Sequence, residues 1–368
     1  MPPLNLLIKP ASSLCNMRCR YCFYADEVKN RTCSPASVMT AETLEVLIRR
    51  AFEYAEGTLT LAFQGGEPTL AGLDFYRSLH DLEVRYNTRR IKVYHAIQTN
   101  GLALDDDWAG FLSSDGWLVG LSLDGCREVH DAHRLDADGK GTYDRVMKAA
   151  RLLRRHRVDF NVLCVVTGQA ARHPIKVYEA LKPFGYVQFI PCLAPLDGHE
   201  QPYSLTNERY GAFLCRTFDL YCRDFHEGHY VSVRNFDNYV RLLAGYPPEE
   251  CAMVGHCTCM GVVESDGSVY PCDFYALDKW RLGDIRTSSF ADLLTSEKAR
   301  EFVRSSMTVP DECRVCPYYR LCRGGCRRER IPAPDGQPGV NRHCTALRAF
   351  FDHSIRSMSE MAMRVRNG

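Results

Sequence analysis

The chain has 368 residues, 45% of them hydrophobic, which is enough for a large globular core. Its 46 Lys and Arg residues nearly balance its 45 Asp and Glu residues, and a net charge of +1 argues against a basic surface for nucleic acid or an anionic membrane. The N-terminal segment lacks the apolar run of a signal peptide, and no stretch of about 18 apolar residues occurs. We therefore expect a cytoplasmic protein without a nucleic-acid or membrane partner.

Up to about residue 230, short apolar runs alternate with helical patterns, which is typical of βα units and a parallel sheet. The sequence predicts an α/β fold with about six such units. Helices are expected over Thr40–Glu56 and Tyr143–His156, whose charged ends suit the helix dipole. The predicted strands are Leu4–Ile8, Thr58–Phe63, Ile91–Ile97, Trp117–Leu123, Phe160–Val166 and Val187–Ile190.

The composition changes near residues 245–248, after which Cys, Gly, Pro and Arg predominate. Such a segment is typical of a small domain organised by metal rather than by an apolar core. We therefore expect one domain over residues 1–235 and a cysteine-rich one over residues 236–368 that ends in a helix.

The 18 cysteines are poorly explained by disulfides, because a reducing compartment would keep most of them as thiols. Three of them, Cys15, Cys19 and Cys22, form a CxxxCxxC run after the first predicted strand. A [4Fe-4S] cluster normally takes four cysteine ligands, so three in one loop leave one iron open for a substrate or cofactor. The alternative is a zinc or iron-sulfur site whose fourth ligand comes from elsewhere.

Polar motifs follow other predicted strands, at Gln64–Pro68, Gln98–Gly101 and Ser122–Gly125. Functional residues of parallel α/β folds lie on loops after the strand C-termini, so these motifs are candidates for the same site. The Gly-Gly-Glu-Pro sequence at residues 65–68 would by itself also be typical of a turn.

A second cysteine system contains eight thiols, which suffice for two complete cages. Full ligation by cysteine suits electron transfer, although paired CxxC spacings suit structural zinc equally well. Cys259 competes with Cys257 as a ligand, and most of the remaining cysteines are expected to be buried. The eight are Cys251, Cys257, Cys272, Cys313, Cys316, Cys322, Cys326 and Cys344; the others are Cys33, Cys126, Cys164, Cys192, Cys215, Cys222 and Cys259.

With an aromatic residue before its last cysteine, the CxxxCxxC loop resembles the radical SAM superfamily, and the later cysteines resemble its SPASM extension. The resemblance implies a partial (β/α)6 TIM-like barrel with a small C-terminal cysteine-rich domain that holds two auxiliary iron-sulfur clusters. It also implies S-adenosylmethionine and three [4Fe-4S] clusters as cofactors, and sensitivity to oxygen. In this family a 5'-deoxyadenosyl radical abstracts an unactivated hydrogen, which is chemistry that the cofactor must supply.

The same resemblance assigns roles to individual residues. Gly66 and Glu67 would contact the methionine part of the cofactor, Tyr21 and Leu193 the adenine, and Ser122 and Arg134 the ribose or carboxylate. Without the resemblance, Ser122 is an ordinary turn hydroxyl and Arg134 a solvated charge. The first auxiliary cluster would take Cys251, Cys257, Cys272 and Cys326, and the second Cys313, Cys316, Cys322 and Cys344.

The segments Ile8–Ser13 and Val263–Tyr275 make the chain similar to anaerobic sulfatase-maturating enzymes. That family oxidises a Cys or Ser of an unfolded or nascent sulfatase polypeptide to formylglycine, with a flavodoxin or ferredoxin-like reductant. The resemblance implies that Asp273 accepts a proton from the substrate radical while an auxiliary cluster accepts an electron, and that Tyr24 and Gln64 contact the substrate. A solvated loop position is the alternative for Asp273.

Two other functions fit parts of the pattern. A peptide maturase that forms thioether or carbon-carbon crosslinks would share the cysteines, but only fourteen residues precede Cys15, which leaves no room for the leader-binding domain that many such enzymes carry. A non-catalytic iron-sulfur electron carrier or zinc-binding module would not need an open iron.

Overall fold

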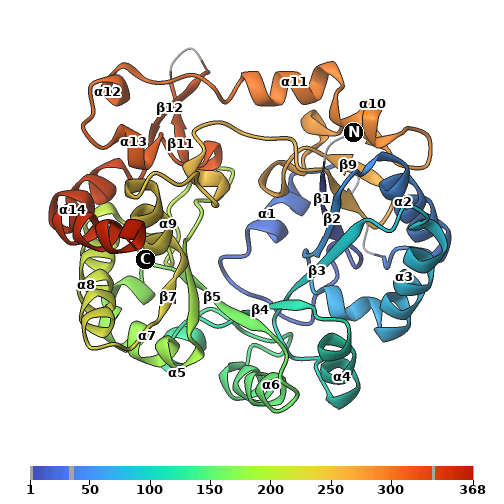
Figure 1. Cartoon of the computed structure of the whole chain (residues 1–368), viewed down its shortest axis with the longest axis horizontal. Helices are drawn as coiled ribbons and strands as arrows, with labels where there is room; N and C mark the ends of the chain where they lie inside the picture. Colours follow the sequence, from blue (N-terminus) through green and yellow to red (C-terminus); the bar gives the residue numbers. More distant parts are fainter. Residues whose placement is uncertain (1–2, 33–36, 334–335, 368) are drawn as a thin grey trace. The chain divides into compact units, whose positions relative to one another are not determined.

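The computed structural model describes residues 3–32, 37–333 and 336–367, and its helices and strands are labelled in Figure 1. The chain forms two compact units, each built from three separate segments. Unit 1 comprises Met1–Ser122, Arg134–Phe160 and Thr258–Phe302; unit 2 comprises Leu123–His133, Asn161–Cys257 and Val303–Gly368. Each unit contains residues from both sides of residue 235. The division into domains over residues 1–235 and 236–368 therefore stays a prediction.

Unit 1 contains a sheet whose strand order is β10-β9-β8-β1-β2-β3-β4. Strands β1 to β4 are parallel, as the βα pattern predicts. The strands are β1 (Leu4–Lys9), β2 (Thr58–Phe63), β3 (Lys92–Thr99), β4 (Leu118–Ser122), β8 (Val262–Glu264), β9 (Ser268–Tyr270) and β10 (Gly283–Asp284). The helices are α1 (Phe23–Lys29), α2 (Ala41–Tyr54), η1 (Pro68–Ala71), α3 (Leu73–Tyr86), α4 (Asp106–Ser114), α6 (Tyr143–Arg155), η5 (Asp273–Tyr275), η6 (Asp278–Trp280), α10 (Phe290–Leu294) and α11 (Glu297–Arg304).

The hairpin β8–β9 joins the sheet of unit 1 from a distant part of the sequence. Strand β8 pairs in parallel with β1, with Leu7 opposite Val262 and Lys9 opposite Glu264. The turn of the hairpin is stabilised by Asp266, whose carboxylate accepts a hydrogen bond from the Ser268 backbone N–H at 2.9 Å. This pairing brings the chain after β9 close to the chain after β1.

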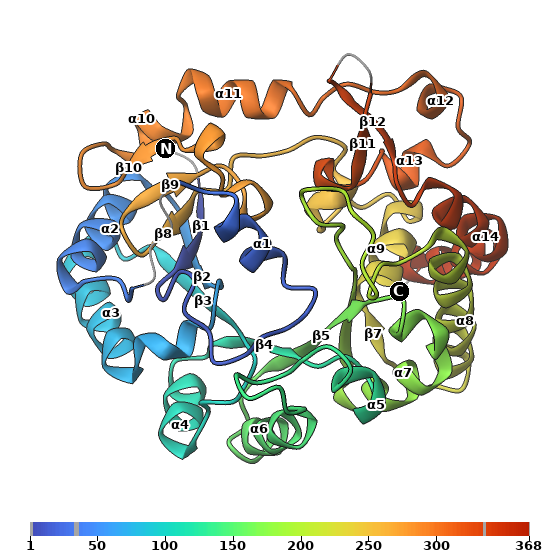
Figure 2. The same ribbon diagram turned by 180° about the vertical axis from the view of Figure 1, so that it is seen from behind.

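Local sequence explains the helices and core of unit 1. Thr40 caps α2 by accepting a hydrogen bond from the Thr43 backbone N–H at 3.2 Å, and one face of α2 is buried. Helices α2 and α3 pack side by side, as Figures 1 and 2 both show. Tyr76 of α3 packs edge-on against Phe63 at 5.1 Å between ring centroids and against Trp117 at 5.6 Å.

Unit 2 contains the parallel strands β5 (Phe160–Val166), β6 (Tyr186–Pro191) and β7 (Ser232–Val233), and a separate antiparallel pair, β11 (Arg330–Pro332) and β12 (Pro338–Asn341). Helices α8 and α14 lie side by side, with Gly211 close to Ala346 (Figure 2). The helices are α5 (Arg127–His130), η2 (Ala170–Arg172), α7 (Pro174–Leu181), η3 (Lys182–Phe184), α8 (Asn207–His226), α9 (Arg234–Leu243), η4 (Cys251–Met253), α12 (Asp311–Arg314), α13 (Tyr319–Cys322), η7 (Arg327–Glu329) and α14 (Cys344–Asn367).

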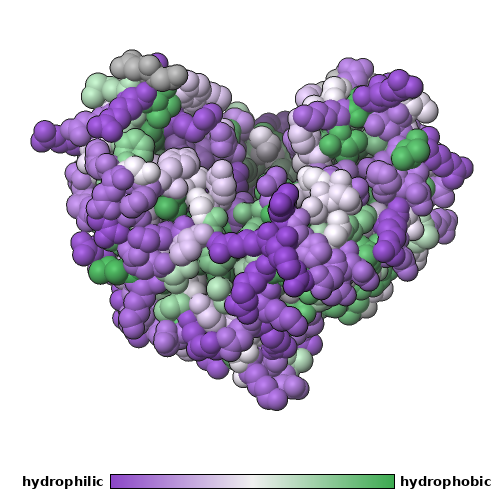
Figure 3. All heavy atoms as spheres, turned by 60° about the horizontal axis from the view of Figure 1, so that its bottom comes forward, coloured by the Kyte–Doolittle hydropathy of each residue, from purple (hydrophilic) through white to green (hydrophobic). Residues whose placement is uncertain are grey.

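All six strands predicted from the sequence are present, two of them with the expected bounds and the others shifted by one or two residues. One shift matters for the site, because β3 continues to Thr99, so the segment Gln98–Gly101 begins inside the strand rather than on a loop. Among the described residues, no helix combines the length and apolar character needed to cross a membrane. On the face drawn in Figure 3, hydrophobic residues occur in small groups among hydrophilic ones.

Candidate active site

The loop between β1 and α1 carries the three cysteines of the CxxxCxxC run, all half-buried. The Arg18 guanidinium donates a hydrogen bond to the Cys15 carbonyl at 2.7 Å, and the Arg18 backbone N–H donates to the Leu135 carbonyl at 2.7 Å. The Cys22 sulfur caps α1 by accepting from the Ala25 N–H at 3.4 Å. Burial raises the pKa of the Cys15 thiol to about 11, so a metal must displace the proton when it binds there. A rigid loop with three partly accessible thiols fits an iron-sulfur cluster.

Gly65 and Gly66 lie after β2 and pack against the first part of the cysteine loop. Both have positive φ, and a Cβ on Gly66 would lie 2.2 Å from the Leu14 carbonyl oxygen and 2.4 Å from that of Ser12. A Cβ on Gly65 would lie 2.6 Å from Cγ of Lys9. Neighbouring protein atoms therefore leave no room for a side chain at either position. This requirement for glycine does not depend on any contact of the backbone with a cofactor.

We expect Gly66→Ala to destabilise the protein by about 3 kcal/mol or more, because neither carbonyl of the cysteine loop can move without disrupting that loop. Thermal unfolding and the iron content of reconstituted protein would measure the effect. Gly57→Ala is the matched control, because Gly57 also has positive φ (73°) but has no atom within 4 Å of the added Cβ. Equal losses of stability in Gly66→Ala and Gly57→Ala would contradict the view that the nearby carbonyls of Ser12 and Leu14 require glycine at position 66.

Glu67 is 1% exposed and joins the loop after β2 to the end of β3. Its Oε1 accepts hydrogen bonds from the hydroxyls of Thr69 and Thr99, both at 2.7 Å, and its Oε2 accepts from the Asn100 N–H at 2.8 Å. Burial raises the pKa of Glu67, and these donors oppose the rise. The Asn100 amide lies 3.9 Å from the Cys15 sulfur, so the network reaches the cysteine loop. These bonds support a positioning role for Glu67, and direct contact with the cofactor remains a prediction.

The other predicted cofactor residues are divided between the units. Ser122 ends β4 and its hydroxyl accepts a hydrogen bond from the Gln98 amide at 3.0 Å. The Arg134 guanidinium lies over the Tyr21 ring, 5.5 Å from its centroid, and both side chains are buried. Arg134 is therefore not a solvated surface charge. Leu193, in unit 2, is half-buried after β6.

Asp273 is held by two side chains of unit 1. It forms an ion pair with Lys9 through Oδ1, and its Oδ2 accepts a hydrogen bond from the Gln64 amide at 2.7 Å. Asp273 is only 8% exposed, which excludes the alternative of a solvated loop position. The structure thus brings together two residues of the predicted site, Asp273 and Gln64, and adds Lys9, to which sequence analysis gave no role.

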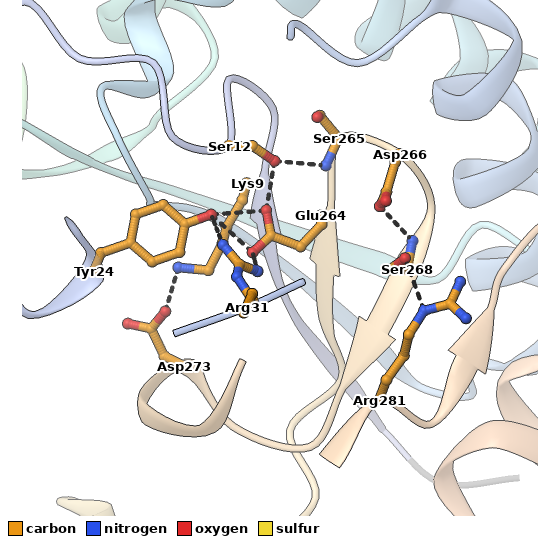
Figure 4. A network of polar contacts seen from close by, with 10 residues as sticks. All are labelled: Lys9, Ser12, Tyr24, Arg31, Glu264, Ser265, Asp266, Ser268, Asp273 and Arg281. Carbon is orange, nitrogen blue, oxygen red and sulfur yellow. Dashed lines mark hydrogen bonds and ion pairs between the residues drawn. The ribbon is translucent and has the colours of Figure 1, made fainter. Parts of the chain in front are cut away.

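Glu264 organises a second buried network beside this pair (Figure 4). Its carboxylate accepts hydrogen bonds from the Tyr24 hydroxyl at 2.7 Å, the Arg31 guanidinium at 2.7 Å and the Ser12 hydroxyl. Tyr24 therefore has its hydroxyl bound within the protein. Ser12 and Glu264 lie in the two segments that carried the family resemblance, which was the available signal for them, whereas nothing in the sequence indicated Arg31.

The cysteines of unit 2 form two groups through the mutual electrostatic effects of their thiols. Burial raises the pKa of Cys326 to about 12, with smaller contributions from Cys257 and Cys251. Burial also raises the pKa of Cys322 to about 11, and Cys344, Cys313 and Cys316 add to the rise. Among the described residues, no three metal-ligand side chains lie close enough together to hold a metal ion, so the division between two clusters stays a prediction. Cys272 belongs to unit 1, where it directly precedes Asp273.

The choice between Cys257 and Cys259 stays a prediction. Cys257 falls in unit 2 and Cys259 in unit 1, but Cys272, which is proposed for the same cluster, also falls in unit 1. The expectation that most remaining cysteines are buried is wrong, because only Cys164 and Cys192 are buried among those described, while Cys126, Cys215, Cys222 and Cys259 are half-buried. Cys126 lies at the start of α5, and Cys215 and Cys222 lie on α8, so a helix end and a helix surface leave these three thiols partly accessible. Cys33 lies outside the described residues.

Arg330 holds the backbone around the cysteines of unit 2. Its side chain is buried and donates hydrogen bonds to the carbonyls of Gly324 at 3.1 Å, Ser306 at 3.0 Å and Gly255 at 3.1 Å, with further bonds to Thr308, Arg323 and Gly325. The planar guanidinium thus connects three chain segments that carry or flank cysteines.

We expect Arg330→Lys to lower stability by about 3 kcal/mol, because an ammonium offers fewer donors and would leave several carbonyls unsatisfied. Iron analysis and thermal unfolding of the reconstituted protein would show lower iron content and earlier unfolding. Arg356→Lys is the control, since the Arg356 side chain is 91% exposed on α14. If Arg330→Lys retained full iron content and stability, the organising role of Arg330 would be wrong.

Comparisons with known proteins agree with this geometry. Residues 10–181 match the model of the radical SAM superfamily, and residues 251–317 match that of an iron-sulfur cluster-binding domain, SPASM. The cysteine-type anaerobic sulfatase-maturating enzyme of Clostridium novyi (strain NT) is 44% identical over 98% of both chains. The serine-type enzyme of Bacteroides thetaiotaomicron is 30% identical over 99% of this chain and 92% of its own.

The solved structure described as native anSMEcpe with bound AdoMet and Cp18Cys peptide has a TM-score of 0.94 at 44% identity, and the match covers 99% of this chain and 100% of that one. The fold class implied by the resemblance, a partial radical SAM barrel with a cysteine-rich auxiliary-cluster domain, is thereby confirmed. The protein is an oxidoreductase whose cofactors are S-adenosylmethionine and iron-sulfur clusters. The chain belongs to the anaerobic sulfatase-maturating enzymes of the radical SAM superfamily.

Proposed function

We propose that this protein oxidises a cysteine of a sulfatase polypeptide to formylglycine. The observation that carries the proposal is the buried Asp273, which directly follows the proposed cluster ligand Cys272 and is fixed by Lys9 and Gln64. A preference for cysteine over serine is supported by the identity of 44% to a cysteine-type relative against 30% to a serine-type one.

We assign the catalytic cluster to Cys15, Cys19 and Cys22. Together with S-adenosylmethionine, this cluster supplies the carbon radical that removes a hydrogen atom from the substrate Cβ. Tyr21 and Arg134, which contact each other, would line the adenosyl part of the cofactor site, as would Ser122. Gly66 and Glu67 would position the backbone that binds the methionine part.

Asp273 then acts as the general base of the second half-reaction. The substrate CH2–SH group would lose one hydrogen atom, one proton and one electron in total. Asp273 would take up the proton, and the bound cofactor and an auxiliary cluster would supply the acceptors for the hydrogen atom and the electron. These losses make a two-electron oxidation to a thioaldehyde, and water replaces its sulfur to give the aldehyde and hydrogen sulfide. Two auxiliary clusters would be held by the cysteines that the family resemblance assigns to them.

Gln64 and Tyr24 are proposed substrate contacts with different roles. The Gln64 amide nitrogen donates to Asp273, so its carbonyl oxygen is the part that can accept from the peptide. The Tyr24 hydroxyl is bound to Glu264, so a contact with the peptide would use the ring. We place the reaction in the cytoplasm, with a flavodoxin or ferredoxin-like protein as the electron donor.

The test is mass spectrometry of synthetic sulfatase peptides incubated anaerobically with reconstituted protein, S-adenosylmethionine and a reductant. The peptides carry Cys or Ser before x-Pro-x-Arg, and a third carries Ala as a control. We expect formylglycine and one 5'-deoxyadenosine per product, with the Cys peptide converted faster than the Ser peptide. Deoxyadenosine without peptide modification would contradict the substrate assignment, and faster conversion of Ser would contradict the preference.

A further inference from the structure

Lys9 is a buried cation at the C-terminal end of β1. Its side chain is fully inaccessible to solvent, and its ammonium pairs with Asp273. Burial by itself lowers the pKa of Lys9, but the nearby carboxylates of Asp273, Glu264 and Glu27 outweigh it and the pKa lies above its usual value. Lys9 is therefore charged, and a buried ammonium requires a fixed partner.

The carboxylate of Asp273 is fixed from two sides, because each of its oxygens has its own hydrogen-bond donor. Lys9 from the end of β1 binds Oδ1, and Gln64 from the end of β2 binds Oδ2 at 2.7 Å. The two donors come from adjacent parallel strands, whereas Asp273 comes from η5, after the hairpin β8–β9. Rigid strands thus determine where the carboxylate points.

The surroundings of Lys9 hold its ammonium in place. Its Nζ lies 3.8 Å from the centroid of the Tyr24 ring, and the Tyr24 hydroxyl is tied to the buried Glu264. The methylene groups of Lys9 occupy the space in which Gly65 lacks a side chain. Its position is thus determined by packing along the whole side chain as well as by charge.

We propose that Lys9 is the positioning residue for Asp273, holding its carboxylate aimed at the substrate, and that Gly65 provides the space for the Lys9 side chain. This inference rests on the proposed function of Asp273 as the base. Without the cation, the carboxylate would lose one of its two anchors, and the substrate radical would decay by other routes before its proton is removed. Cofactor cleavage precedes this step and does not require Asp273.

The test compares reconstituted Lys9→Met, Lys9→Arg and wild-type holoenzymes, with the Cys peptide as substrate. Methionine retains the packing against Gly65 but lacks the charge, whereas arginine restores the charge. We expect the ratio of formylglycine to deoxyadenosine to fall roughly tenfold in Lys9→Met and to recover at least in part in Lys9→Arg. Lys92→Met is the matched control, because Lys92 also lies over a tyrosine ring, that of Tyr94, but is exposed on β3.

A second measurement uses thermal unfolding instead of turnover. In a double-mutant cycle, Lys9→Met and Asp273→Asn should each destabilise the holoenzyme, because each single change leaves a buried charge without its opposite charge. The double variant should therefore lose less stability than the sum of the two single losses. Additive losses would overturn the pairing. An unchanged product ratio in folded Lys9→Met would overturn the positioning role.

The outcomes also separate this inference from the proposed function. If wild-type protein makes formylglycine and Lys9→Met keeps the wild-type ratio, only the role of Lys9 is wrong. If wild-type protein makes deoxyadenosine but no formylglycine, the proposed function is wrong, whatever the double-mutant cycle shows.

Discussion

Cys19→Ala is expected to abolish 5'-deoxyadenosine formation, and formylglycine with it. Cys19 is the central thiol of the loop between β1 and α1, and two thiolates cannot hold a cluster that normally takes three from this loop. Loss of a residue that merely hydrogen-bonds to a metal ligand typically lowers metal affinity or activity by about 10–100-fold. Loss of the ligand itself should therefore reduce the rate of deoxyadenosine formation by more than about 100-fold. Chromatography of the reaction mixture measures deoxyadenosine, and iron analysis should show the loss of one cluster.

Cys222→Ala is the matched control for this change. Cys222 is a half-buried thiol on α8 that belongs to neither cysteine group of unit 2, so its loss should leave deoxyadenosine formation and iron content unchanged. Substantial deoxyadenosine formation by Cys19→Ala would refute the assignment of the catalytic cluster to this loop.

The second large effect is expected for Asp273→Asn, which should lower formylglycine formation by about 100-fold or more while deoxyadenosine still forms. Asparagine keeps the size of the side chain and its bond to Lys9, but it cannot take up the substrate proton. Parallel measurement of formylglycine by mass spectrometry and of deoxyadenosine by chromatography separates the two half-reactions.

Asp266→Asn provides the control on the same segment. Asp266 accepts a hydrogen bond from the Ser268 backbone N–H in the hairpin turn, and an asparagine oxygen can accept the same bond. Product formation should therefore be unchanged. If Asp273→Asn also retained wild-type product formation, another group would have to be the base.

Most of the parallel sheet could be predicted because its signals are local. Each of the six predicted strands is an apolar run next to a helical pattern, and β2 and β5 have the expected bounds. Strand β8 could not be assigned, since it has three residues and acquires its place only by pairing with β1, more than 250 positions earlier. The residues that make up each unit could not be predicted either, because each unit is assembled from three separate segments of the chain.

The residues of the candidate site also divide into those that could be predicted from the sequence and those that could not. The cysteine loop was indicated by the spacing of its thiols, whereas the roles of Gln64–Pro68 and Asp273 were indicated by the resemblance to a known family. Arg31 stands in no motif, and Glu264 was given no role of its own within the segment Val263–Tyr275. Their importance arises from a buried ion pair of 2.7 Å between distant positions. Lys9 likewise looks like an ordinary strand-end lysine until Asp273 is placed beside it.

The pairing of β8 with β1 also affects how the protein is made. Strand β1 leaves the ribosome early, yet its β8 partner is synthesised only after most of the chain, so one edge of the growing sheet stays unpaired and open to association with other chains. Contacts between residues 264 positions apart, such as that of Lys9 with Asp273, are slow to form because a long loop must close first. Unit 1 therefore cannot be completed before Thr258–Phe302 has been synthesised, and until then its folding should depend on protection of the β1 edge.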